Sequence, residues 1–363
     1  LDQEILASII KDLDSHRGSS VVIAGDGQPP AVHALAAAIN EELGNVGKTV
    51  VYTAEDSSDR MASMRVLDQR LRSGVIDTLV IVGGNPVYDA PADLDFAEAM
   101  KSAKHVVHLS YDVDETSRLA EWHLPRPHFL ESWGDTRAYN GTISITQPLI
   151  EPMIDLAQKG WTSLELLARI AGSEPRDGYS IVRATEAMRS GTSGSTFESH
   201  WRTILDAGVI SGTAYPLSTG LKINARQIET ALGTLTAARK KVGAGDLEFQ
   251  FLSDSPVYDG RFANVGWLQE LPDAVTKITW DNALLVSPAL CREKGLRQGD
   301  KVRISVGGRS VEAAVFPVPG MDIGTVAMSM GWGRGEAAGP VGADAGFDAY
   351  PIRTTTSPWI ATK

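Results

Sequence analysis

The sequence predicts an α/β protein that begins with a doubly wound, mostly parallel sheet and ends in a region rich in strands. Over the first 110 residues, short apolar segments take turns with helical segments. Within the apolar segments, apolar and polar residues do not alternate, as they would in a half-exposed strand. Continuous apolar strands separated by helices are typical of a parallel sheet covered on both faces. After residue 247 the predicted elements are mainly strands.

The alternation of the first part can be followed in chain order. Strands are predicted at 19–25, 49–53, 78–82 and 105–110, and helices at 1–16, 31–43, 58–73 and 94–102. Pro29 and Pro30 suit the first turn of a helix, and Gly44 suits its end. This order predicts a Rossmann-like domain over residues 1–175.

The remainder of the chain differs in composition and in its predicted elements. Residues 124–152 are irregular and rich in Pro and Gly, with one short strand at 142–146, and a helix is predicted at 156–171. The linker-like composition of 190–196 predicts a mobile loop or a boundary. Helices at 198–207 and 225–240 belong to a connecting region, 176–246. Strands at 247–253, 301–306, 310–317 and 325–330 build the last domain, 247–363, with a hairpin at Gly307-Gly308.

Composition excludes several classes of function. The 363 residues favour two domains, and a compact chain of 38.9 kDa would expose about 14,000 Å². A net charge of −11 disfavours nucleic acid as a partner, and no apolar stretch is long enough for a membrane span. One cysteine permits neither an internal disulfide nor an iron–sulfur cluster held by this chain alone. The start at Leu1 suggests a piece of a longer protein.

The first candidate binding loop follows the first predicted strand. Gly25, Gly27 and Gln28 form part of a dinucleotide fingerprint, in which glycines let backbone N–H groups approach a pyrophosphate. Pro30 stands where that fingerprint has its third glycine, which permits close helix–strand packing. Both NAD binding and an ordinary strand–helix turn therefore remain open here.

The second candidate loop consists of Gly83, Gly84, Asn85 and Pro86. It follows the strand at 78–82, and open α/β sheets bind ligands at the carboxyl ends of their strands. Asn85 could bind a phosphate or a sugar, or the loop could be a simple turn.

Acidic residues follow the next strand. The acidic cluster of Asp112, Asp114 and Glu115 could hold a ribose, a guanine edge or a metal, but Asp114 could equally cap a short helix.

Other polar and aromatic segments carry weaker signals. His105 and His108 lie at odd separation on one strand, so they face opposite sides and do not suggest a shared metal. Cys291 is expected to be a small buried hydrophobe. The segments 133–141 and 258–264 could line a cleft or pack as structural loops. No catalytic residue and no metal ligand is predicted.

Taken together, the segments resemble the molybdopterin oxidoreductase superfamily. The resemblance rests on Gly25-Asp26-Gly27-Gln28, Leu43 to Lys48, Gly83 to Pro86, Asp112 to Thr116 with Leu124-Pro125, Glu131 to Gly141, and Gly295 to Val302. The strings ESWGDTRAYNGTISITQPLI, YDGRFANVGWLQELPD, KITWDNALLVSP and DAYPIRT are similar to the large iron–sulfur subunit of alternative complex III, which oxidises quinol.

The resemblance implies a C-terminal, double-psi-like β-barrel that corresponds to the domain that binds the pterin dinucleotide. It also implies a scaffold role without a pterin of its own, with other subunits of a membrane-bound respiratory complex as partners, at the periplasmic face of the cytoplasmic membrane. Iron–sulfur clusters would lie in other parts of a longer protein. One alternative is a fragment of a catalytic enzyme dependent on molybdenum and molybdopterin guanine dinucleotide, with Gly83, Gly84, Asn85 and Pro86 on the dinucleotide. A second alternative is an NAD-dependent dehydrogenase.

Overall fold

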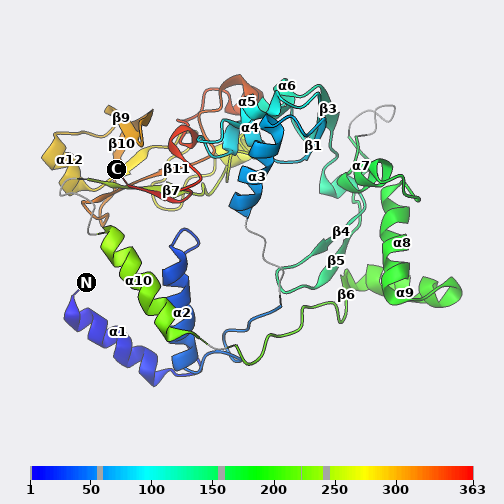
Figure 1. The fold of residues 1–363 in the computed structure, drawn as a ribbon, viewed down its shortest axis with the longest axis horizontal. Helices are drawn as coiled ribbons and strands as arrows, with labels where there is room; N and C mark the ends of the chain where they lie inside the picture. Colours follow the sequence, from blue (N-terminus) through cyan, green and yellow to red (C-terminus); the bar gives the residue numbers. More distant parts are fainter. Residues whose placement is uncertain (1, 55–59, 154–159, 222, 240–245, 363) are drawn as a thin grey trace.

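The computed structural model is a mixed α/β protein with a small parallel sheet, a larger curled sheet and a helical arm (Figure 1). It describes residues 2–54, 60–153, 160–221, 223–239 and 246–362. Helices α1 (Gln3–Ser15), α2 (Pro30–Glu42) and α10 (Ala225–Arg239) form the arm, and α2 packs beside α10. The arm lies apart from the parallel sheet (Figure 1).

The small sheet confirms the parallel part of the predicted architecture. Its order is β1–β2–β3, with β1 (Thr78–Val82), β2 (His105–Ser110) and β3 (Trp122–Pro125) all parallel. Helices α3 (Arg60–Arg72) and α5 (Phe96–Met100) cover one face, where Leu71, Leu79 and Met100 are buried together. Short helices α4 (Pro86–Asp89) and α6 (Glu115–Leu119) follow β1 and β2.

The prediction of two further strands, at 19–25 and 49–53, was wrong for this structure. Both segments are extended but belong to no sheet. The Asn40 side chain takes the place of a neighbouring strand: it accepts a hydrogen bond from Val22 N and donates one to Val22 O. Residues 49–53 instead touch the segment before α10, where Ser218 N donates to Tyr52 O over 2.8 Å.

The middle of the chain forms a separate helical and β core. Strands β4 (Gly134–Arg137), β5 (Ile143–Thr146) and β6 (Val209–Ile210) make an antiparallel sheet. Helices α7 (Ser163–Ile170), α8 (Gly178–Ser190) and α9 (Gly194–Ala207) accompany it. Trp133 and Trp201 pack within this core, whereas the rest of segment 133–141 is largely exposed, with Tyr139 93% exposed. The region 190–196 is the turn between α8 and α9, not a boundary, because Gly191 ends one helix in a left-handed conformation and Gly194 begins the next.

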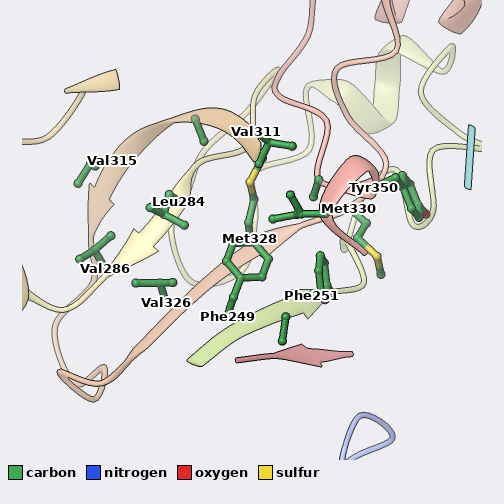
Figure 2. Packing of buried hydrophobic residues seen from close by; sticks show 14 of the residues in the cluster. Phe249, Phe251, Leu284, Val286, Val311, Val315, Val326, Met328, Met330 and Tyr350 are labelled. Carbon is green, nitrogen blue, oxygen red and sulfur yellow. The ribbon is translucent and has the colours of Figure 1, made fainter. Parts of the chain in front are cut away.

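The C-terminal part is a six-stranded sheet that curls into half of a barrel; a double-psi barrel is not confirmed. Its order is β12–β7–β11–β8–β10–β9, with bounds β7 (Glu248–Leu252), β8 (Leu284–Val286), β9 (Lys301–Val306), β10 (Arg309–Pro317), β11 (Thr325–Ser329) and β12 (Ile360–Ala361). Figure 2 shows Phe249, Val286, Val326 and Met328 gathered inside the curl. The hairpin at Gly307-Gly308 is confirmed between β9 and β10.

Short helices complete this part. They are α11 (Gly266–Gln269), α12 (Pro288–Lys294), η3 (Gly335–Ala338), α13 (Gly339–Gly342) and η4 (Tyr350–Ile352). A further short helix, η1 (Phe129–Glu131), lies between β3 and β4. Cys291 is buried in α12 among aliphatic side chains, as expected. Among the described residues, no helix combines the length and apolar character needed to cross a bilayer.

The chain exposes 21760 Å², far above the roughly 14,000 Å² expected for a compact chain of its mass. The separated helical arm accounts for part of the difference. Helix α1 has no buried residue, and Ile5, Ile9 and Ile10 are all exposed. The expectation of a compact molecule was therefore wrong, because apolar segments that were predicted to enter one sheet lie outside it.

Candidate functional site

The candidate site lies at the carboxyl edge of the parallel sheet, where this sheet meets the C-terminal part. The turn after β1 contributes Gly83, Gly84 and Asn85, and the turn after β2 contributes Tyr111 and Asp112. Segment 258–264 and the segment around Arg334 close the opposite side. Together they line a cavity of about 130 Å³. Segment 258–264 could have lined a cleft or packed as a structural loop, and the structure places Asp259, Gly260, Arg261 and Asn264 on the cavity.

A buried ion pair crosses the junction. Arg334 donates to both carboxylate oxygens of Glu115, over 3.0 Å from Nε and 2.6 Å from Nη2. The guanidinium also donates to the carbonyl of Gly260 over 2.6 Å. The two side chains are only 7% and 18% exposed. Burial acts to raise the pKa of Glu115, but the hydrogen bonds and charge of Arg334 outweigh it, so the pKa lies below its ordinary value.

Asn85 is bound to the same carboxylate. Its amide nitrogen donates to Glu115 over 2.5 Å, and its amide oxygen accepts from the backbone N–H and the hydroxyl of Thr116. The Asn85 side chain, one of the candidate ligand-binding groups, is therefore bound to α6 in this structure. These bonds hold the turn after β1 against the turn after β2.

Glycines allow loops of the C-terminal part to approach one another closely next to the junction. A Cβ on Gly331 would lie 2.5 Å from the backbone nitrogen of Gly260, and a Cβ on Gly333 would lie 2.2 Å from that of Asp348. Both glycines have positive φ, which L side chains rarely adopt. No side chain is tolerated there without movement of the backbone.

A buried histidine, His108, binds the glycine turn that follows β1. His108 is fully buried, with Nε2 3.0 Å from the carbonyl of Gly84 and Nδ1 2.8 Å from the Ser117 hydroxyl. A carbonyl can only accept, so Nε2 carries the proton and Nδ1 accepts from Ser117. His123 lies 3.0 Å from the same hydroxyl. Burial lowers the pKa of His108, which favours this neutral form.

Two further arginines border the cavity. Arg261 is paired with Asp259, with Nη2 2.7 Å from the carboxylate. The Arg126 guanidinium lies 5.2 Å from the centre of the Tyr111 ring, and one of its nitrogens lies against Gly83. Among the described residues, no carboxylate lies within ion-pair distance of Arg126. Arg126 is thus the cationic group of this cavity that could meet an anion.

Two carboxyl groups near Glu115, those of Asp89 and Asp348, are weaker acids than usual. Burial, together with the charge of Asp259, raises the pKa of Asp89 to about 7. Burial also raises the pKa of Asp348 to about 7, with Glu115 adding to the shift. Tyr88, whose hydroxyl donates to the carbonyl of Trp332, has its pKa raised by burial.

The structure brings most of the predicted site residues together. Gly83, Gly84, Asn85, Asp112 and Asp114 all border the cavity, and Pro86 begins α4 just beyond it. Asp114 caps α6 by accepting from Ser117 N, which is the structural alternative for this residue.

Gly25 and Gln28 do not border the cavity. They form a turn of their own, in which Gln28 N donates to Gly25 O. An NAD site needs this turn at the edge of a sheet, and residues 19–25 belong to none here.

Sequence reasoning included Glu115 in the acidic cluster, but it missed Arg126 and the pairing of Glu115 with Arg334. Glu115 and Arg334 lie 219 residues apart, so no local pattern relates them. Arg126 carried one usable signal: it directly follows the strand beside β2, where parallel sheets present ligand-binding residues. Within the described ranges, no group of three or more His, Cys, Asp or Glu could hold a metal ion.

Comparison with known proteins shows the fold. No family model matches the chain, and no curated protein matches its sequence. Among solved structures, the chain is similar to acetylene hydratase from Pelobacter acetylenicus, with a TM-score of 0.55 and 14% sequence identity. The match covers 82% of this chain and 46% of that one. The chain therefore spans less than half the length of that structure, and the likeness concerns fold alone.

Proposed function

We propose that this chain is a non-catalytic, pterin-fold part of a molybdopterin-oxidoreductase-like subunit. The subunit would belong to a quinol-oxidising respiratory complex of the alternative complex III type, at the periplasmic face of the membrane. The order of motifs along the chain supports the superfamily, as does the fold shared with acetylene hydratase, a molybdopterin enzyme. In this role the chain supports assembly with other subunits, and the electron-transfer clusters lie elsewhere.

One observation carries the scaffold assignment: the chain's own side chains occupy the ligand position beyond β1. Asn85 and Arg334 both bind Glu115, so the polar groups of the turn are already paired. The cavity beside the turn has about 130 Å³, below the roughly 300–1,000 Å³ typical of small-molecule sites, and a second cavity of about 350 Å³ lies on the side lined by Glu115 and Arg334. In the proposed scaffold these pairings leave no polar group of the Asn85 side chain for a pterin dinucleotide.

One observation favours the alternative, a fragment of a catalytic molybdopterin enzyme. Arg126 faces the cavity beside Gly83 and has no carboxylate partner in the described part of the chain. A free guanidinium next to a glycine turn is suited to an anionic group such as a phosphate. This alternative makes Gly83, Gly84 and Arg126 the residues that would hold the dinucleotide.

Titration of the chain with GDP, a probe for the nucleotide end of the dinucleotide, separates the two functions. Isothermal titration calorimetry should detect no binding by the scaffold. Micromolar binding that is lost in Arg126→Gln would instead support the cofactor-bearing alternative. Arg303→Gln is the matched control, because Arg303 is an exposed arginine on β9 paired only with Glu312.

A further inference from the structure

The curled sheet of the C-terminal part holds an apolar cavity of about 380 Å³. Its inner wall consists of buried aliphatic side chains such as Leu284, Val286 and Val326, which Figure 2 shows inside the curl. Residues of β9 and of β12 both border the cavity. These two strands are the edges of the six-stranded sheet, so the cavity lies where the curl is not closed into a full barrel.

The edge strand β9 turns an apolar row toward this cavity. Val302, Ile304 and Val306 alternate with exposed residues along the strand, and all three are half-buried. The exposed residues face the opposite side, where Arg303 pairs with Glu312 of β10. β9 therefore presents aliphatic side chains to the cavity and charged groups to the outer face.

This lining favours an apolar ligand. Water needs about two to four polar partners to occupy a cavity, whereas cavities lined by aliphatic side chains stay dry and take up apolar molecules. The volume falls within the roughly 300–1,000 Å³ typical of small-molecule sites, which are common in the mouths of β-barrels. A hydrocarbon chain that enters the cavity should gain about fourfold in affinity for each CH₂ group that it buries.

A lysine at the mouth of the cavity indicates the charge of the ligand. Lys294, the last residue of α12, borders the cavity, and its side chain is 52% exposed. Its ammonium lies 3.0 Å from the carboxylate of its chain neighbour Glu293, and an exposed pair of this kind is weak. The ammonium is therefore available to a carboxylate at the end of a bound hydrocarbon chain. Asp246 and Thr362 also border the cavity, so a cationic ligand is the alternative that the experiment must exclude.

We propose that this cavity binds the hydrocarbon chain of a small monocarboxylate, whose carboxylate lies at Lys294. No described residue borders both this cavity and the cavity of the candidate site. The proposal therefore does not depend on the function proposed above.

A series of straight-chain carboxylates tests the binding. Isothermal titration calorimetry of the full chain with hexanoate, octanoate and decanoate should show the affinity rising about 15-fold for each added pair of CH₂ groups, until the ligand outgrows the cavity. Intermolecular nuclear Overhauser effects should join the terminal methyl group of octanoate to the methyl groups of Ile304 and Val286. Such contacts would place the hydrocarbon chain inside the curl.

Matched variants locate the chain and the head group of the ligand. Ile304→Trp fills the cavity from β9 and should weaken octanoate binding about 10-fold or more. Ser310→Trp is its control, because Ser310 is exposed on β10 and precedes the buried Val311 in the strand, so its side chain faces outward. This control should leave the affinity unchanged. Lys294→Gln should weaken octanoate binding about two- to fivefold and leave the binding of 1-octanol, which has no charge, unchanged.

Any of four results would overturn the proposal. They are the absence of binding, an affinity that does not change with chain length, octanoate binding that is unchanged in Ile304→Trp, and tighter binding of octylammonium than of octanoate. Thermal unfolding shows whether each variant folds. If Ile304→Trp does not fold, the Overhauser contacts of octanoate in the unmodified chain decide, and contacts only with residues outside the cavity would contradict the proposal.

Discussion

Glu115 and Arg334 form a two-pronged ion pair that joins the parallel sheet to the C-terminal part of the chain. The distances of 3.0 and 2.6 Å, and the low exposure of both side chains, place the pair inside the junction. Asn85 adds a third hydrogen bond to the same carboxylate. The Glu115 carboxylate therefore holds together three segments that are distant in sequence: the turn after β1, helix α6 and the segment around Arg334.

Removal of this carboxylate should destabilise the protein strongly. Glu115→Ala leaves Arg334 buried without its partner, and breaking a buried pair in this way costs about 3–5 kcal/mol. Urea unfolding monitored by tryptophan fluorescence measures the change. Glu312→Ala is the control: Glu312 forms exposed pairs with Lys301 and Arg303, and its removal should change the stability little. Equal losses in the two variants would contradict a structural role for the junction.

The carboxyls of Asp89 and Asp348 should make stability fall as the pH rises. Both have a folded-state pKa of about 7, above the ordinary value of 3.8. Between about pH 4 and 7 the folded protein holds protons that the unfolded chain has released, so their contribution is lost as the pH rises through 7. Each group adds at most about 1.4 kcal/mol per pH unit to the slope. Unfolding midpoints of the chain and of Asp89→Asn/Asp348→Asn, measured from pH 4 to 8, should diverge most at high pH. Parallel curves would contradict the shifts.

His108 should act in the opposite direction. Because its pKa is lowered in the fold, the unfolded chain takes up a proton more readily, and the stability falls as the pH drops below about 6.5. His108→Ala leaves the Gly84 carbonyl and the Ser117 hydroxyl without this partner, at a cost of about 1–3 kcal/mol. The variant should also lose the decline in stability below pH 6.5. The control is His105→Ala, because His105 lies on the exposed face of the same strand. This variant should change neither the stability nor its decline below pH 6.5.

Close backbone contact between two loops of the C-terminal part should make Gly333 intolerant of a side chain. Gly333→Ala places a Cβ 2.2 Å from the Asp348 nitrogen, so the backbone must move. Gly335 has a similar positive φ, but nothing lies within 4 Å of its Cβ position. Gly335→Ala therefore carries the conformational strain without the clash. Thermal unfolding should show a clearly larger loss for Gly333→Ala, and similar losses would contradict the close approach.

Local sequence signals predicted the elements that depend on local interactions. The strands β1 and β2, the hairpin at Gly307-Gly308 and the cap at Asp114 all follow from apolar runs, turn glycines or a capping side chain. The strand at 19–25 failed because its pairing depends on distant groups: Asn40 occupies one edge, and no strand occupies the other.

The candidate site was only half predictable for the same reason. Glycines and acidic residues after β1 and β2 marked the edge of the sheet, and these residues do border the cavity. The sequence held no sign that Arg334 would bind Glu115 and fill the position beside Asn85. That contact depends on how two parts of the chain dock, which no local spacing encodes.

The central claim is that this pterin-like fold carries no pterin of its own. Elemental analysis for molybdenum, tungsten and iron, together with the fluorescence of oxidised pterin, tests it on the protein purified from its native source. The account predicts iron without molybdenum, tungsten or pterin. About one equivalent of molybdenum or tungsten accompanied by pterin would contradict it, and would make the turn from Gly83 to Pro86 a cofactor site.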